Sequence, residues 1–333
     1  MATRKRLPVK VRRFGKMAGV ILVAVVLGGL AFPSPLRAGI PGVGGMRVLF
    51  EADSVYHHIV VAEDDRARYL RFDRSFQSGM LLSDPFESPF LYAAYAHLGL
   101  LFRPQATYVL VIGLGGGSIP KRFWRDYREM TVEVSELDPM VVQVAERFFE
   151  VQAGPRLRIA VQDGRQFLMR TAQRYDIIIV DAYFAESIPF HLTTVEFYRL
   201  AKSRLAPGGV VVSNIIGALA GPRSALFRSM YKTQLAVFPG LYPFPVAFLP
   251  YLDADAIRNI MLMATDERGL TRPQISARSR QISVRTTFPQ FVQYAADYYD
   301  AAIPTGDVPI LTDDYAPVDT LLPVYRWTPA QNP

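Results

Sequence analysis

Apolar residues occur in this chain as short continuous runs separated by amphipathic stretches, and the most prominent run ends in a glycine cluster. Residues 109–118 read Val-Leu-Val-Ile-Gly-Leu-Gly-Gly-Gly-Ser. An unbroken apolar run is typical of a parallel strand that helices cover on both faces. Glycines permit a tight turn and a close approach of the backbone to a ligand. We therefore expect a helix directly after this loop, with its N-terminus facing a bound cofactor.

Strand-like runs and helical patterns alternate beyond this point. The pattern predicts strands at 108–112, 131–135, 157–161, 175–180 and 210–214, helices at 119–127, 139–149, 165–172, 193–205 and 222–237, and a closing strand hairpin at 241–248 and 259–264. Such alternation indicates an α/β fold with a doubly wound, mostly parallel, seven-stranded sheet. Residues 266–290 are polar with turn character, and 290–299 predict a short helix.

The segment before the glycine loop has a different pattern. Residues 46–80 contain short apolar runs separated by charged turns, which predict a small antiparallel β-domain, and the apolar stretch 90–102 predicts a buried helix. The expected organisation is therefore a leader and linker at 1–45, the β-domain with its lead-in helix at 46–105, and the main α/β domain at 106–325.

The leader has the layout of a secretory signal or an uncleaved signal anchor. Residues 1–16 hold seven Lys and Arg and no acidic residue, and residues 17–32 are apolar. Sixteen helical residues span ~24 Å, less than the ~30 Å hydrocarbon core, which slightly favours a cleaved signal. We expect membrane association or export through this segment. The positive-inside rule would place the body of the protein outside, whereas a cytoplasmic cofactor would favour the opposite side.

The charge of the chain resides in the leader. The whole sequence has 37 basic and 30 acidic side chains, so removing the seven basic residues at 1–16 leaves 37 − 7 = 30 of each sign. The neutral remainder gives no reason to expect nucleic-acid binding. The absence of cysteine excludes disulfides, thiolate metal ligands and a cysteine nucleophile. The four histidines are scattered without metal-ligand spacing, so we expect no metal site.

Three acidic residues follow successive predicted strands: Glu136, Asp163 and Asp181. Because ligands of open α/β sheets bind at the carboxyl ends of the strands, these side chains should converge on the glycine loop. Glu136 is placed to accept the ribose hydroxyls of an adenosine, and Asp163, followed by Gly164, to accept the adenine amino group. Each acid alone could instead be a helix N-cap, and the glycine loop alone could serve a nicotinamide enzyme.

Several motifs in this order resemble the spermidine synthase branch of the class I S-adenosylmethionine-dependent, methyltransferase-like Rossmann fold. They lie at 54–59, 72–77, 109–118, 135–139, 162–164, 175–181 and 205–209. Segments 181–194 and 311–317 are most similar to the spermidine-synthase-like domains of membrane-attached bacterial proteins.

The resemblance implies a set of roles for individual residues. Decarboxylated S-adenosylmethionine, or S-adenosylmethionine itself, would be held by Gly113, Gly115, Gly116, Glu136, Asp163, Gly164 and Gln77. Asp181 matches the catalytic aspartate, which would orient the acceptor amine and take its proton. The implied acceptor is putrescine or a similar amine, and the implied assembly is a homodimer.

The acceptor half departs from the family pattern. Phe184 occupies the position of a second aspartate, His57 that of a glutamine, and Ala93 that of a histidine. Each change removes a polar partner from the amine site, and desolvating an unmatched ammonium is costly. Tyr183 could line the acceptor channel, and Glu186 could replace the missing acid.

Other polar residues leave open interpretations. Asp314, or its neighbour Asp313, could fold over the crevice or belong to a turn, Glu186 could be an exposed loop acid, and His191 could be a general base or a loop residue. Three functions therefore remain: an aminopropyltransferase, an S-adenosylmethionine-dependent methyltransferase, and a membrane-attached protein that binds a nucleoside or polyamine without turnover.

Overall fold

Two β-sheets organise the protein, and both appear in the predicted places. The computed structural model describes residues 45–184, 187–284, 286 and 288–321, all within one compact unit. The basic leader and the apolar run 17–32 lie outside these residues. Within the described part of the chain, no helix has both the length and the apolar character needed to cross a membrane.

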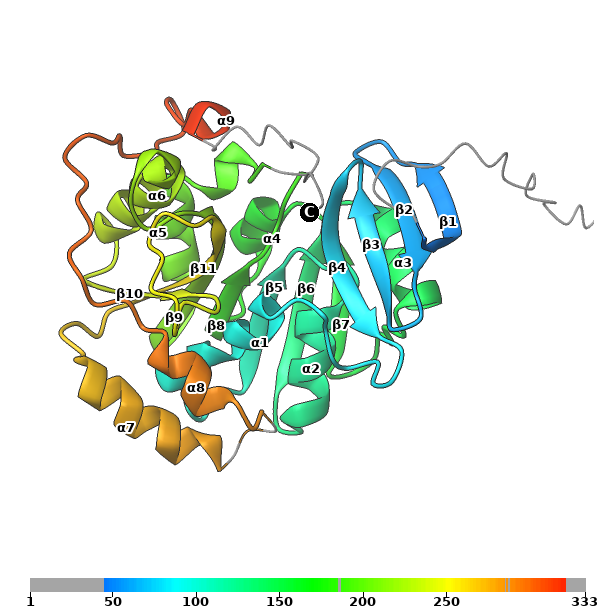
Figure 1. Cartoon of the computed structure of the whole chain (residues 1–333), viewed down its shortest axis with the longest axis horizontal. Coiled ribbons are helices and arrows are strands. Elements are labelled where there is room, and N and C mark those ends of the chain that lie inside the picture. The colour runs from blue at the N-terminus through cyan, green and yellow to red at the C-terminus, as the bar shows by residue number, and fades with distance from the viewer. Residues whose placement is uncertain (1–44, 185–186, 285, 287, 322–333) are drawn as a thin grey trace, which may run out of the picture. The chain divides into compact units, whose positions relative to one another are not determined.

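The N-terminal sheet is a four-stranded antiparallel meander. Its strands are β1 (Arg47–Asp53), β2 (His58–Glu63), β3 (Ala67–Phe72) and β4 (Ser75–Leu81), in the order β1-β2-β3-β4. In Figure 1 this sheet stands beside the β6 and β7 side of the main sheet. The turn into β3 is closed by Asp64, whose carboxylate accepts hydrogen bonds from the backbone N–H groups of Arg66 and Ala67.

The main sheet has seven strands in the order β10-β11-β9-β8-β5-β6-β7. They are β5 (Tyr108–Ile112), β6 (Thr131–Glu136), β7 (Leu157–Val161), β8 (Tyr175–Val180), β9 (Leu205–Gly217), β10 (Gly240–Pro245) and β11 (Arg258–Thr265). The first five are parallel, and β10 and β11 form the expected antiparallel hairpin. The predicted seven-stranded, mostly parallel α/β sheet is thus confirmed.

Helices cover both faces of this sheet. The α-helices are α1 (Tyr92–Tyr95), α2 (Ser118–Asp126), α3 (Pro139–Phe148), α4 (Gly164–Arg170), α5 (Val195–Ser203), α6 (Ala225–Leu235), α7 (Arg272–Ser283), α8 (Phe291–Ala296) and α9 (Val318–Leu321); η1 (Ala96–Leu101), η2 (Phe190–Leu192) and η3 (Pro222–Ser224) are 3₁₀ segments. One face packs against η1, α2, α3, α7 and α8, and the other against α4, α5 and α6. Because both faces are covered, β8 is buried along its whole length.

Local sequence signals account for several helix starts. Asp138 caps α3 by accepting a hydrogen bond from the N–H of Met140, and Pro139 occupies the first turn. Thr194 caps α5 through the N–H of Phe197. The structure thus places these helices within a few residues of their predicted bounds.

Two segments differ from expectation. Residues 266–290, expected to be turns, contain α7, which begins with a capping box between Thr271 and Gln274. Its buried stripe comprises only Ile275, Ser279 and Ile282, so the segment has too little hydrophobic periodicity to indicate a helix. The expected single helix at 90–102 is instead α1 followed by η1. A continuous apolar run does not specify the helical type.

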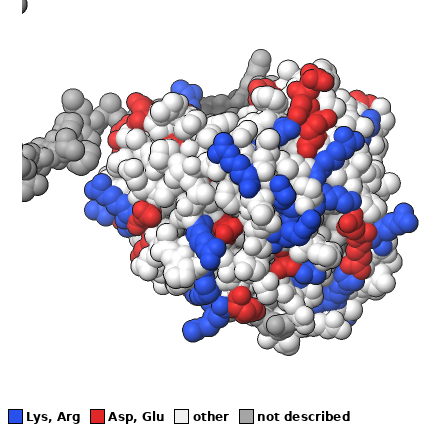
Figure 2. All heavy atoms as spheres, turned by 180° about the vertical axis from the view of Figure 1, so that it is seen from behind, with Lys and Arg blue, Asp and Glu red and all other residues white. Residues whose placement is uncertain are grey.

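The face shown in Figure 2 carries charged side chains of both signs. Lys and Arg side chains lie next to Asp and Glu side chains there. This arrangement agrees with the balance of charges counted in the sequence after the leader.

Candidate active site

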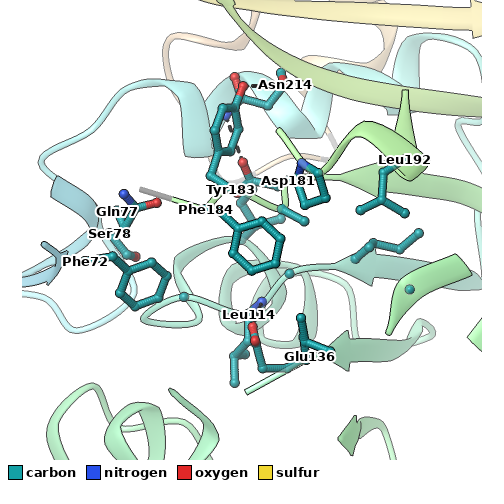
Figure 3. Close-up of a pocket in the computed structure, with 18 of the residues that line it drawn as sticks. Phe72, Gln77, Ser78, Leu114, Glu136, Asp181, Tyr183, Phe184, Leu192 and Asn214 are labelled. Atoms are coloured by element: carbon teal, nitrogen blue, oxygen red, sulfur yellow. Dashed lines mark hydrogen bonds between the residues drawn. The ribbon is translucent and has the colours of Figure 1, made fainter. Parts of the chain in front are cut away.

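A pocket lies where the carboxyl ends of β5, β6 and β8 meet the N-terminal sheet. Its walls come from the glycine loop, from β4, from the loop after β8 and from β9 and β11. Figure 3 shows Glu136 at one end and Asp181, Tyr183 and Asn214 at the other. The predicted convergence of Glu136, Asp163 and Asp181 is therefore observed, since all three line this pocket.

The glycine loop brings three strand ends together. Gly113 has φ of 97°, and a Cβ atom there would lie 2.2 Å from the backbone oxygen of Asp181. Only glycine tolerates both this conformation and this contact. Gly113 and Gly115 line the pocket, as does Ser118 at the start of α2.

Gly116, expected to cradle the cofactor, is not among the residues that line the pocket. A Cβ atom at Gly116 would lie 2.9 Å from the ring of Phe149 and 3.0 Å from the hydroxyl of Ser78. This glycine therefore permits the loop to pack against its neighbours. Sequence spacing alone did not distinguish a glycine that faces a ligand from one that faces the core.

Glu136 holds the glycine loop in place while facing the pocket. Its Oε2 accepts a hydrogen bond from the N–H of Leu114 (2.8 Å), and its Oε1 accepts one from the N–H of Asp138 (2.9 Å). Burial raises the pKa of this carboxyl group, and backbone hydrogen bonds from Asp138, Leu114 and Leu137 oppose that rise. A carboxylate has about four acceptor sites, so Glu136 retains capacity for the hydroxyl groups of a ribose.

Asp163 combines the two roles that the sequence left open. It caps α4 by accepting a hydrogen bond from the N–H of Gln166, and it lines the pocket. Burial alone would raise the pKa of Asp163. Hydrogen bonds from His191 and from the backbone lower it by more than burial raises it, so the pKa is lowered overall. A Cβ atom at Gly164 would lie 2.2 Å from Ile112 Cγ2, so this position accepts only glycine.

His191 belongs to the adenosine side of the pocket. Its Nε2 lies 2.8 Å from Asp163 Oδ2, and its backbone oxygen accepts a hydrogen bond from Arg165 Nη1. The sequence left a general base or a loop residue as alternatives. The imidazole of His191 pairs with Asp163 and not with Asp181, which favours the interpretation of His191 as a structural loop residue.

Asp181 follows β8 directly and occupies the opposite end of the pocket. Its Oδ1 accepts a hydrogen bond from Asn214 Nδ2 at 2.8 Å. Burial raises the pKa of Asp181 to about 6, and the hydrogen bond from Asn214 opposes that rise. A carboxylate with a pKa near the operating pH is suited to general base catalysis.

Tyr183 contributes its ring to the pocket wall, as expected, while its hydroxyl group has a structural task. The hydroxyl donates to the backbone oxygen of Asn214 (2.8 Å) and accepts from the N–H of Ile216 (3.1 Å). The loop after β8 is thereby attached to the end of β9.

Aromatic side chains form the wall where the acceptor was expected. The rings of His57 and Phe72 stack with centroids 4.0 Å apart and 6° between planes, and Phe184 lies 5.4 Å from His57. Burial lowers the pKa of His57, which favours its neutral form. Gln77 lines the same pocket, and its backbone oxygen accepts a hydrogen bond from Tyr92.

Glu186 and Asp314 are the remaining candidates for the acceptor half. Glu186 lies outside the described residues. Asp314 is exposed in a turn closed by the Thr312–Tyr315 bridge and is absent from the pocket lining, so the alternative of a turn residue holds. Its neighbour Asp313 pairs with Arg165 and accepts a hydrogen bond from Thr194 instead.

Sequence reasoning missed Asn214 and Asn259, which line the pocket beside Asp181. A polar residue inside the apolar run 210–216 was the available signal, but nothing in the sequence linked it to residue 259. In the described part of the chain, no group of His, Cys, Asp or Glu residues could hold a metal ion.

Comparison with known proteins gives a consistent family. The spermine/spermidine synthase domain family matches residues 90–251. The polyamine aminopropyltransferase of Vibrio vulnificus is 29% identical over 292 residues, which cover 84% of this chain and 93% of that protein.

Two solved structures share the fold. A probable spermidine synthase from Corynebacterium glutamicum superposes with a TM-score of 0.61 at 21% identity, covering 78% of this chain and 99% of its own. The spermidine synthase of Thermotoga maritima gives 0.54 at 19% identity, with 75% and 87% covered.

The Glu136→Gln variant tests the adenosine half. The glutamine amide removes the negative charge of Glu136. Its amino group also faces at least one backbone N–H donor, with which it cannot form a hydrogen bond. Hydrogen bonds to charged groups contribute about 1.5–3 kcal/mol, so affinity for methylthioadenosine should fall by about 10- to 100-fold. Isothermal titration calorimetry measures this change. The exposed Glu129→Gln serves as the control, and equal affinity in both folded variants would contradict the assignment.

Proposed function

Because the chain belongs to the spermidine synthase family, we propose that it transfers an aminopropyl group from decarboxylated S-adenosylmethionine to putrescine or a related amine. The family match and the polyamine aminopropyltransferase relative support this activity. The single observation that carries it is the position of Asp181, a buried carboxylate at the opposite end of the pocket from Glu136.

The chemistry requires a base at this position. A primary ammonium has a pKa near 10 and is almost wholly protonated at pH 7, so it lacks the lone pair needed for attack. Asp181 attracts the ammonium, orients it and takes one proton. The amine nitrogen then attacks the propyl carbon bonded to the sulfonium. The carbon–sulfur bond breaks, its electron pair stays on sulfur, and neutral methylthioadenosine is released.

The residues of the pocket divide this work between two halves. Gly113, Gly115, Glu136 and Asp163 form the half suited to adenosine, with Gly164 allowing close packing beneath it. Asp181 faces the other half, whose wall includes His57, Phe72 and Phe184. Aromatic faces attract cations, so this wall can accommodate an alkylammonium chain.

A second candidate is methyl transfer from S-adenosylmethionine. The specific observation that favours methyl transfer is Phe184. By the resemblance, soluble spermidine synthases carry a second aspartate at this position. The two donors differ in one carboxylate, so their affinities distinguish the functions. Tighter binding of the carboxylated donor, with methyl transfer and no amine-dependent methylthioadenosine release, would favour this candidate. Binding without any turnover would favour a polyamine or nucleoside receptor.

We also propose that residues 1–45 export the protein or attach it to a membrane, and that the folded part forms a homodimer. The first proposal is supported by the basic segment followed by the apolar run 17–32. A topology reporter fused after residue 45 should report an external location if the positive-inside rule holds. A cytoplasmic signal would contradict that orientation. Analytical ultracentrifugation of residues 46–333 tests the dimer.

Asp181→Asn should abolish turnover while keeping the site intact. Asparagine has the same shape but takes no proton, so amine-dependent methylthioadenosine release should fall by about 10²- to 10⁴-fold. Methylthioadenosine affinity should change little. In the unsubstituted protein, kcat should decrease as the pH falls below about 6, because protonated Asp181 no longer accepts the amine proton. A substantial residual rate at every pH would contradict the role of Asp181.

Phe184→Asp should improve recognition of a diamine. It adds a carboxylate beside His57 that can pair with the second ammonium group of putrescine, and a charged hydrogen bond of about 1.5 kcal/mol corresponds to a roughly tenfold lower KM. Phe184→Leu is the matched control, since it removes the ring without adding charge. If the aspartate variant had the higher KM for putrescine, the ammonium would bind elsewhere.

A further inference from the structure

Two asparagines lie on neighbouring strands inside the main sheet. Asn214 is on β9 and is 4% exposed, and Asn259 is on the adjacent antiparallel strand β11. An amide group buried among apolar side chains costs free energy unless it is hydrogen-bonded. The hydrogen bonds of these two amides lead to Asp181.

The direction of each hydrogen bond between these two asparagines and Asp181 follows from which atoms can donate. Asn259 Nδ2 donates to Asn214 Oδ1 at 3.0 Å, and Asn214 Nδ2 donates to Asp181 Oδ1 at 2.8 Å. A carboxylate only accepts, so the Asn214 amino group must face Asp181. The Asn214 oxygen then faces the β11 side, where Asn259 supplies the matching donor.

The backbone of Asn214 binds the same loop. Its carbonyl oxygen accepts the hydroxyl hydrogen of Tyr183, so both the side chain and the main chain of Asn214 contact the loop after β8. Figure 3 shows Asn214 above Asp181 and Tyr183, with these contacts dashed. The orientation of the Asp181 carboxylate is therefore set from inside the sheet.

This arrangement leaves one carboxylate oxygen for chemistry. Oδ1 of Asp181 is occupied by the amide, and among the described residues no hydrogen bond reaches Oδ2. The titratable side chains that line the pocket with Asp181 are His57, Tyr92, Glu136, Asp163, Tyr183 and His191. Burial raises it, and the Asn214 hydrogen bond opposes this rise.

We propose that Asn214 and Asn259 are positioning residues that hold the Asp181 carboxylate in its acceptor-ready orientation and keep it ionised for the amine. This inference rests on the proposed aminopropyl transfer. Asn214 acts directly on the carboxylate, and Asn259 acts through Asn214. Neither asparagine has to contact the reacting atoms for this role.

Asn259→Asp is the sharpest test because aspartate has the same shape as asparagine. Residue 259 is also separated from the Asp181 carboxylate by two hydrogen bonds, so the substitution does not alter the proton acceptor itself. The new carboxylate at residue 259 cannot donate, so Asn214 must turn its amino group toward β11 and its oxygen toward Asp181. The lost donor and the added negative charge both disfavour the ionised form of Asp181. Asn214→Leu removes the donor outright. Ser213→Ala is the control, because Ser213 is buried on the same strand and contacts Tyr198 and Gln234 instead.

The pH dependence of kcat for amine-dependent methylthioadenosine release separates positioning from general damage. In Asn259→Asp and Asn214→Leu, the acid limb should move upward by about one pH unit, so the rate should fall by about twofold at pH 7, by nearly tenfold at about pH 5, and recover at higher pH. Ser213→Ala should keep the original acid limb. Rate losses that are equal at every pH, with an unmoved limb, would overturn the inference.

A second measurement keeps the inference testable if the protein does not catalyse aminopropyl transfer. The carboxyl stretching band of Asp181 is identified by difference infrared spectra against Asp181→Asn and titrated without substrate. Its midpoint should rise in Asn259→Asp whether or not the protein turns over. An unchanged midpoint in variants that keep their circular dichroism spectrum would reject the role of the asparagines. Absent turnover with a shifted midpoint would reject only the proposed function.

Discussion

The contact between Gly113 and the backbone of Asp181 is the constraint on which the site depends. A side chain at residue 113 would collide with the Asp181 carbonyl group, whose oxygen lies 2.2 Å from the position of a Cβ atom. Asp181 donates its N–H to Ile112, and Gly113 donates its own to Ser135. The ends of β5, β6 and β8 are thereby joined at one point, which brings acids from distant parts of the sequence into one pocket.

The two ends of the pocket use different physical means. At the adenosine end, each acid also satisfies local backbone donors: Glu136 those of Leu114 and Asp138, and Asp163 that of Gln166. Such carboxylates are preorganised before a ligand arrives, which lowers the cost of binding. At the other end, Asp181 is held by an amide rather than by backbone donors, and burial raises its pKa to about 6. A group that must take up a proton benefits from that weaker stabilisation.

The aromatic wall is where the pocket departs from the pattern that the resemblance to spermidine synthases predicts. His57, Phe72 and Phe184 come from the β1–β2 turn, from β3 and from the loop after β8. The resemblance predicts an aspartate in place of Phe184 and a glutamine in place of His57, so this surface is uncharged while His57 is neutral. The Glu136 end of the pocket therefore follows the pattern of the resemblance, whereas the Asp181 end departs from it.

Local pattern was sufficient for the parallel sheet and for the positions of Glu136, Asp163 and Asp181. Continuous apolar runs report burial on both faces, and strand ends in such a sheet always meet at one edge. The local pattern was insufficient for α7, because the buried stripe of that helix is too sparse to show a helical period. It was also insufficient for Gly116, which packs against Phe149 and does not line the pocket. The pairing of Asn214 with Asn259 spans 45 residues and arises only when β9 and β11 become neighbours. Sequence thus determined the parallel strands and the acids at their ends, while tertiary structure decided which side chains meet, because contacts between distant segments depend on the topology of the whole sheet.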